Sequence, residues 1–447
     1  AVWEGGVVKC LVGVAGDAKE KPMIEAVSMC LYHVLADCPD NVAIAVASGA
    51  PKVLMDLCKD KSLLVQLHAA ASACELASHG GTEARQAMLA AGGLKNLTAV
   101  AAALDTEDVI AKQGINKAIA YEAGARQRAA ATALRLLSVE EGAKKSAGEV
   151  GVLKQLVILI GGSQDVKAQE EGAHALFLLM GDARNRPLLL ACGGLPPLAK
   201  LLESPSEHAK TMAAGAFKEV SRDVALRADV RKAGAISPLV QICFEATAAS
   251  AHVEAAGALL ELANELECKV ILKDIGATKD LASLLKSSHA HVQENALAVL
   301  AFMCAFGKEN IKQAEVRLSL TSCTDLQDDV CECGAVGDIV ALARSGGKTV
   351  HNQALCSLAA VCLRHPPNAA QAAAASGVEA VVRHLTSVDA TVQANAIHAL
   401  LSLAGSYEPN RREAARLGAP ATLLVLTGVH APPPCACLLL RHSQRFG

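Results

Sequence analysis

The sequence predicts an all-α protein that grows as a linear array of helical repeats rather than around one hydrophobic core. Three observations support this prediction. Hydrophobic residues make up 52% of the 447 residues, but aromatic residues only 2%, and Ala and Leu, which dominate, favour helices over sheets. One glycine-led phrase recurs along the chain. Between its copies, apolar residues recur every three or four positions, as in helices that bury one face.

The recurring phrase is a glycine followed by a Leu-rich stretch, as in GAPKVLMDL from Gly49 and GAISPLVQI from Gly234. Its glycines stand at 6, 49, 92, 151, 193, 234, 276, 334, 377 and 418, so we expect ten second helices to begin near these positions. Seven of the nine spacings are 41, 42 or 43 residues, whereas the spacings of 59 and 58 each hold an insertion of about 16 residues.

Each period predicts three helices. The first is short and often begins with an asparagine, which we interpret as an N-cap because its side-chain oxygen accepts an orphan backbone N–H; these residues are Asn41, Asn185, Asn310, Asn368 and Asn410. We expect the glycine 8–9 residues later to adopt a left-handed conformation that ends this helix. The Leu-rich second helix and a polar turn follow, and then an Ala-rich third helix, such as those from Val292 and Val392.

This three-helix pattern resembles the armadillo repeat of the catenins, importin-α and plant U-box ligases. The closest matches are VQENALAVL from Val292, NIKQA from Asn310 and GAISPLV from Gly234. The resemblance covers Gly6 to about Gly428 and implies a right-handed α-solenoid of about ten repeats over residues 1–428. HEAT repeats have a similar period but only two helices, and they lack the short helix before the glycine. Because the chain begins with a second helix, we expect further sequence ahead of Ala1.

Three segments depart from the pattern. The first insertion, at about 105–123, lies between a second and a third helix and contains IAKQGINKAIA, which could extend a helix. The second, at about 315–330, interrupts a first helix and is expected to be a loop. Residues 429–447 form a Pro-rich tail, in which Pro432, Pro433 and Pro434 exclude the expected third helix.

The composition argues against several function classes. With a net charge of −3, the chain lacks the excess of basic residues that is typical of a nucleic-acid-binding protein. The sequence also has no uncharged apolar run of 18 residues that would suggest a membrane span. Most of the 16 cysteines lie in helical patterns. We therefore expect free thiols and a cytoplasmic protein, with the nucleus or the cilium as alternatives.

We expect no catalytic, cofactor or metal site. The segment SGGKT from Ser345 resembles a phosphate-binding loop, but Leu342 stands where the first glycine is needed, and a polar turn is due there. The Cys-x-Cys pairs at Cys331/Cys333 and Cys435/Cys437 lack the usual spacing of zinc ligands.

A column along the third helices is the expected binding surface. In importin-α a Trp–Asn ladder at this column clamps a basic peptide. No asparagine occupies the column here, and no tryptophan lies one turn earlier, so the chain does not resemble a nuclear-import receptor. We still expect the column and the histidines one turn before it to face a groove; the candidate residues are Glu75, His174, Leu178, Glu219, Glu261, Phe302, His398 and Ser402. The glutamates predict a protein partner with a basic or amphipathic segment.

The predicted function is therefore a protein–protein interaction scaffold that holds a partner segment in its groove, and not an enzyme. Two alternatives stay open. One is the substrate-binding arm of a larger enzyme, such as an E3 ubiquitin ligase, and the other is a structural armadillo protein of the cilium or cytoskeleton.

Overall fold

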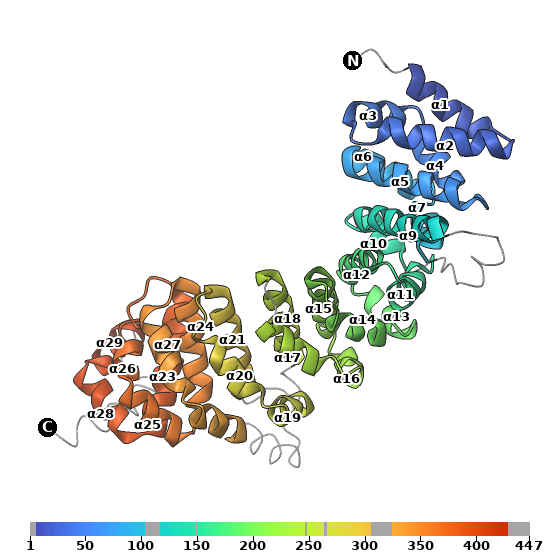
Figure 1. Ribbon diagram of the computed structural model, residues 1–447. Helices are drawn as coiled ribbons and strands as arrows, with labels where there is room; N and C mark the ends of the chain where they lie inside the picture. The colour runs from blue at the N-terminus through green and yellow to red at the C-terminus, as the bar shows by residue number, and fades with distance from the viewer. Residues whose placement is uncertain are drawn as a thin grey trace. The chain divides into compact units, whose positions relative to one another are not determined.

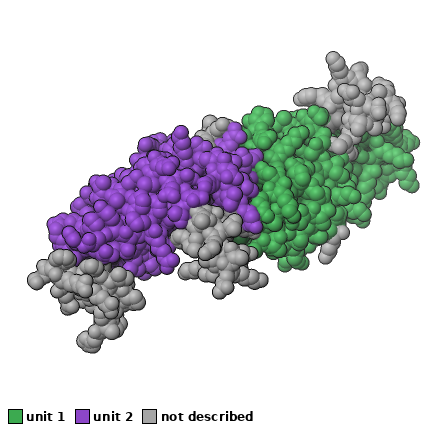
Figure 2. Space-filling view, turned by 90° about the horizontal axis from the view of Figure 1, so that it is seen from below, with its two compact units in different colours: residues 1–235 green, residues 236–447 purple. Residues whose placement is uncertain are grey.

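The computed structural model describes residues 6–102, 117–148, 150–245, 248–262, 266–304 and 324–427. All of its regular elements in these ranges are helices, so the all-α prediction is confirmed. Contacts between residues divide the chain into two compact units, Ala1–Ala235 and Ile236–Gly447, which are coloured separately in Figure 2.

Unit 1 repeats a first, a second and a third helix, and it begins with a second helix (Figure 1). The second helices are α1 (Gly6–Asp17), α4 (Ala50–Leu57), α7 (Gly93–Ala102), α11 (Val152–Gly162) and α14 (Leu195–Leu202). The third helices are α2 (Lys21–Leu35), α5 (Leu63–His79), α9 (Lys117–Leu137), α12 (Val166–Met180) and α15 (Glu207–Ser221). The first helices are α3 (Pro39–Ala47), α6 (Gly81–Ala90), α10 (Glu141–Ser146), α13 (Asn185–Ala191) and α16 (Arg227–Lys232), the last preceded by the 3-10 turn η1 (Val224–Leu226).

Unit 2 follows the same order. Its second helices are α17 (Ile236–Glu245), α20 (Ala277–Leu284), α23 (Ala335–Ser345), α26 (Gly377–Val382) and α29 (Ala419–Thr427). Its third helices are α18 (Ala249–Leu262), α21 (Ala290–Cys304), α24 (Lys348–Val361) and α27 (Ala390–Ser406). Its first helices are α19 (Leu266–Asp274), a helix over residues 324–332, α25 (Pro366–Ala374) and α28 (Glu408–Arg416).

The core of each unit runs between neighbouring repeats. In unit 1, α2 packs on α5, α5 on α9, α9 on α12 and α12 on α15; in unit 2, α18 packs on α21, α21 on α24 and α24 on α27. The buried side chains are mostly Ala, Leu and Val. Small residues let these helices approach closely, and nearest-neighbour stacking supplies the core that a single repeat lacks.

The predicted glycine turns are confirmed at most positions. A left-handed conformation, with φ between 69° and 85°, occurs at Gly49, Gly92, Gly151, Gly193, Gly234, Gly276, Gly334 and Gly418. At Gly377 the prediction is wrong, because the left-handed residue is Ser376 (φ 58°), and Gly377 is the first residue of α26.

The asparagines do not cap their helices, so that interpretation is wrong. Asn185 lies inside α13 and is buried, and its Nδ2 donates to the carbonyls of Leu179, at the end of α12, and of Lys144, in the previous first helix. Asn368 and Asn410 likewise donate two hydrogen bonds each. One goes to a carbonyl of the preceding third helix, and the other goes to a carbonyl of the previous first helix, 41 residues earlier. Asn310 lies outside the described residues. The amides of Asn185, Asn368 and Asn410 therefore tie α13, α25 and α28 to the first helix of the preceding repeat.

The insertions are described in part. Since α9 begins at Lys117, the end of the first insertion lengthens a third helix, whereas residues 103–116 lie outside the described ranges. The second segment was expected to be a loop, but its part from residue 324 onward is helical; residues 305–323 and the tail from 428 lie outside the described ranges.

Candidate partner-binding surface

The third helices of unit 1 carry a cluster of rings that are half-buried or exposed. His174 and Phe177 lie on α12, and His208 lies on α15 at its first turn. The ring centroids of His174 and Phe177 are 6.5 Å apart, and those of His174 and His208 are 5.3 Å apart with the rings nearly edge to face. His174 and Phe177 are half-buried and His208 is exposed. We call these three rings, together with Gly215, the aromatic patch.

A glycine positions the phenylalanine. A Cβ built on Gly215 of α15 would lie 2.9 Å from Cδ2 and from Cε2 of Phe177. The ring therefore rests against the backbone of the next third helix, at a distance that only glycine permits. Helix α15 is held at its start by Ser206, whose hydroxyl accepts a hydrogen bond from the Ala209 N–H.

Ion pairs surround the aromatic patch. Arg135 on α9 pairs with Glu171 on α12, and Arg128 pairs with Asp165 at 2.8 Å. Glu170 accepts hydrogen bonds from Lys167 at 2.7 Å and from the Ser206 hydroxyl at 2.5 Å. Most of these contacts join one repeat to the next, so the charges stiffen the surface and are largely neutralised within it.

The environment of His174 keeps its ring neutral near pH 7. Partial burial, together with the nearby Arg135 and His208, lowers the pKa of His174 to about 4. A neutral imidazole beside Phe177 makes this part of the surface suitable for an uncharged or aromatic side chain.

The structure brings three of the predicted groove residues of unit 1 onto α12 and α15. Leu178 is half-buried next to Phe177. Glu219 is only 8% exposed, and its carboxylate already contacts Arg222 at 2.8 Å and Arg186 at 3.4 Å. Glu75, on α5, is half-buried and lies 3.6 Å from His79. The acidic character expected from Glu219 is therefore compensated by the chain itself.

The remaining predicted residues lie on the third helices of unit 2. Glu261 on α18 is half-buried, His398 on α27 is exposed, and Ser402 on α27 is buried. Phe302 belongs to α21, but its side chain lies outside the described residues.

Sequence reasoning missed Phe177, His208 and Gly215. The signal was present one position before the chosen column, where unit 1 carries Tyr32, Cys74, Arg135, Phe177 and Lys218, all half-buried. Contact between Phe177 and Gly215 depends on how two repeats stack, which a single column does not reveal.

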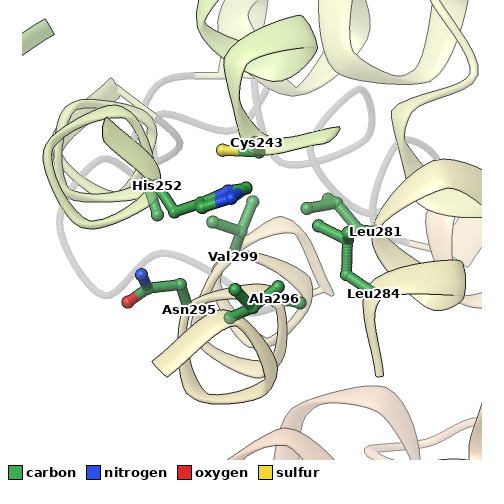
Figure 3. Close-up of a pocket in the computed structure, with 9 residues that line it drawn as sticks. Cys243, His252, Leu281, Leu284, Asn295, Ala296 and Val299 are labelled. Carbon is green, nitrogen blue, oxygen red and sulfur yellow. The ribbon is translucent and has the colours of Figure 1, made fainter. Parts of the chain in front are cut away.

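One pocket in the interior of unit 2 is too small for a small-molecule substrate. A pocket between α17, α18, α20 and α21 is lined by Cys243, His252, Leu281, Leu284 and Val299 among others (Figure 3). It has a volume of about 10 Å³, enough for one water molecule, whereas small-molecule sites occupy roughly 300–1,000 Å³. Burial also raises the pKa of the Cys243 thiol to about 12, so this thiol is not a nucleophile at neutral pH.

A larger pocket of about 290 Å³ lies beside α25, α26 and α28. Its acidic residues, Glu379 and Glu413, pair with Arg383 and Arg416. Throughout the described ranges, no three His, Cys, Asp or Glu residues lie close enough together to hold a metal ion. Among these same residues, no helix has the length and apolarity needed to cross a membrane.

Comparison with known proteins agrees with the helix order. The sequence model of the armadillo/beta-catenin-like repeat family matches residues 182–222, which contain α13, α14 and α15 in the order first, second and third helix. The chain is an armadillo-repeat solenoid. Its aromatic patch uses α15 from the matched armadillo repeat and α12 from the one before.

The armadillo-repeat chain is also similar to the outer dynein arm-docking complex subunit 2 of Bos taurus, with 27% identity over 150 residues. The match covers 33% of this chain and 14% of that protein. Among solved structures, one engineered protein superimposes with a TM-score of 0.77 at 24% identity, covering 98% of this chain and 97% of its own. A second engineered protein gives a TM-score of 0.50 at 26% identity over 57% of this chain and 98% of its own. These structures agree with the fold.

Proposed function

We propose that the chain is a protein–protein interaction scaffold that binds a segment of a partner along the third helices of unit 1, with the aromatic patch as its anchor. The observation that carries the proposal is Phe177, a half-buried ring on the backbone of Gly215 in a chain with only 2% aromatic residues. Aromatic side chains in such positions supply much of the affinity of protein interfaces.

The charges around the patch point to the kind of partner. Arg135 and Glu171 pair with each other, and Glu219 pairs with two arginines. A purely basic peptide would have to compete with these arginines for the carboxylates, whereas an amphipathic segment can place an apolar side chain beside Phe177 and leave the ion pairs intact. We therefore propose an amphipathic segment with an aromatic or aliphatic anchor.

A second proposal concerns the setting. Similarity to a subunit of an outer dynein arm-docking complex, although limited to 150 residues, supports a role in assembling a ciliary or cytoskeletal complex. Residence of the tagged chain in the cilium of a ciliated source cell would support it, and exclusion from the cilium would contradict it.

Site-specific photo-crosslinking tests the binding surface. A photoreactive amino acid at His208, which is exposed next to Phe177, should capture a partner in the source cell. The same amino acid at Val224, which is 65% exposed in the same unit, serves as the control position. Phe177→Ala should abolish capture at His208, whereas Val224→Ala should leave it unchanged. Equal capture at both positions, or capture unaffected by Phe177→Ala in a folded protein, would show that the partner binds elsewhere.

A further inference from the structure

Two histidine rings stack across a repeat boundary of unit 2. His351 lies in the first turn of α24, and His384 follows α26 by two residues, in the turn that leads to α27. Their ring centroids are 4.8 Å apart, and the ring planes are inclined by 28°. Both residues are half-buried. The pair therefore joins the third helix of one repeat to the turn after the second helix of the next.

Backbone carbonyls at the end of α23 orient both rings. Nε2 of His384 lies 2.9 Å from the carbonyl oxygen of Ala343, and Nδ1 of His351 lies 3.4 Å from that of Gly346. Carbonyls at the end of a helix lack a partner within the helix, so a ring N–H that donates to them satisfies part of this helix end. A neutral imidazole has one N–H, and here each ring directs it to α23. The two rings thus connect α23, α24 and α26 while both are neutral.

The charges around the pair make a second proton unfavourable. Burial lowers the pKa of His384 below its ordinary value, and the nearby His351 and Arg383 lower it further, against the opposing effect of the Ala343 carbonyl. Arg383 is exposed and lies 3.6 Å from Glu379. When both rings are protonated, two positive charges stand 4.8 Å apart. Repulsion at this distance changes an equilibrium constant by roughly 5- to 300-fold, for a dielectric constant between that of water and that of a protein surface.

Three further contacts at this boundary keep their charge state between about pH 5 and pH 8. Lys348 at the start of α24 pairs with Asp389 before α27 at 3.1 Å, and this lysine holds the pKa of the Asp389 carboxyl below its ordinary value. Nδ2 of Asn395 donates to Oδ1 of Asn352 at 2.9 Å. Arg344, at the end of α23, donates to a backbone carbonyl ahead of α26. A change of pH in this range therefore acts on the histidine pair and leaves these contacts intact.

We propose that His351 and His384 form a proton-sensitive joint, which holds the two repeats together while both rings are neutral and loosens when both are charged. The direction of the effect follows from His384, whose pKa is lower in the folded chain than the unfolded value of about 6.5. Its contribution to stability is fully present above that value and is lost as the pH falls through the folded value. This joint is independent of the aromatic patch, which belongs to unit 1.

Hydrogen exchange of the full chain tests the joint. Protection factors, which remove the intrinsic effect of pH on exchange, are compared at about pH 7.5 and about pH 5.5 for the amides of residues 377–390. In the wild type they should fall by at least about fivefold on acidification. His351→Gln and His384→Gln each keep a side-chain N–H donor but cannot become charged, so the fall should be less than about twofold in either variant. His291→Gln is the matched control, because this histidine is exposed on α21, and it should behave as the wild type does.

NMR titration of the histidine rings separates coupling between the charges from a purely structural role. In the wild type, mutual repulsion should make His384 titrate over a wider pH range than a single independent site. In His351→Gln the pKa of His384 should rise toward its ordinary value, because one of the groups that lower it is removed. The wild-type curve decides the question even if a glutamine variant has already lost protection at about pH 7.5.

Two outcomes would overturn the proposal. An equal fall of protection in the wild type and in both glutamine variants would assign the pH dependence to other groups, such as the contact of His365 with Asp328. A single-site titration of His384 in the wild type, with the same midpoint in His351→Gln, would show that the two rings do not interact.

Discussion

Replacing Gly215 by alanine tests whether the Phe177 ring rests on α15. In an ordinary helix interior this change stabilises a protein by about 0.5–1 kcal/mol, because alanine loses less conformational entropy than glycine. At Gly215 the new Cβ would lie 2.9 Å from two ring carbons of Phe177, so the ring or the helix must shift, at a cost of about 1–3 kcal/mol. We expect Gly215→Ala to destabilise unit 1 by about 0.5–2 kcal/mol.

The double-mutant cycle with Phe177→Ala separates these two effects. Without the ring, the Cβ meets no obstacle on that side, and Gly215→Ala should stabilise unit 1 by about 0.5–1 kcal/mol. The coupling between the two changes should therefore be about 1–3 kcal/mol. Urea unfolding followed by circular dichroism measures all four proteins. Gly142→Ala is the matched control, because a Cβ there would meet only Leu89, at 3.9 Å, and its effect should be the same with and without Phe177.

A simple result would refute this reasoning. If Gly215→Ala stabilises the protein equally in both backgrounds, the ring does not lie on the glycine. The aromatic patch would then lack a fixed geometry, and the anchor of the proposed function would lose its structural basis.

The remaining predictions concern the repeat itself. Asn185→Ala should lower the free energy of unfolding by about 1–3 kcal/mol in urea, because the amide's hydrogen bonds to the carbonyls of Leu179 and Lys144 are lost. Asn41→Ala, which removes one hydrogen bond to the Val34 carbonyl, should cost less. The folded-state pKa of His174, about 4, lies below the unfolded value near 6.5. The contribution of His174 to the stability of unit 1 should therefore be fully present above about pH 6.5, and the free energy of unfolding should decrease by about 1–2 kcal/mol toward pH 4. This dependence on pH should be weaker in His174→Gln. Ser376→Gly should stabilise the chain by about 1 kcal/mol, because serine is disfavoured at φ 58°, and thermal unfolding with an unchanged midpoint would contradict this.

The fold could be predicted from the sequence because the same residue pattern recurs along the chain, and each copy predicts the same local structure. The left-handed glycines are required by backbone sterics, so each copy carries the signal independently. The exception is informative. Ser376 lies eight residues after Asn368, the same distance that separates Asn41 from Gly49 and Asn185 from Gly193. Counting eight residues from Asn368 places the left-handed turn at Ser376, whereas the recurring glycine phrase predicts it at Gly377.

The asparagines show where a local rule fails. An asparagine before a helix is a good N-cap, but Asn185 uses its amide to bind carbonyls on two other helices. One of these acceptors is 41 residues away, and its position is set by repeat stacking rather than by the neighbouring sequence. The repeat period of the sequence was sufficient to find Asn185, but not to find the carbonyls to which its amide donates.

The contacts of the candidate residues could not be predicted, for the same reason. The third-helix column includes residues of α12 and α15, but it could not show that Arg186 and Arg222 pair with the carboxylate of Glu219. Nor could it show that Gly215 leaves space for a ring from the preceding repeat. Both facts depend on pairs of residues more than 30 positions apart or on helix packing, which composition and spacing leave undetermined.

Binding at the aromatic patch would also act on the stability of the scaffold. Phe177 belongs to one repeat and Gly215 to the next, and ion pairs such as Arg135–Glu171 cross the neighbouring boundary. A partner segment held there contacts more than one repeat at once, so it binds the stacked state and not the separated one.

At a free concentration of 100 times its Kd, such a partner segment stabilises the folded state by about 2.7 kcal/mol. This is comparable to the cost expected for losing the Asn185 contacts, so a bound partner could offset the loss of one such tie between repeats. The surface that recognises the partner and the interface that stacks the repeats are therefore made by the same helices, and a substitution at the patch is expected to affect both.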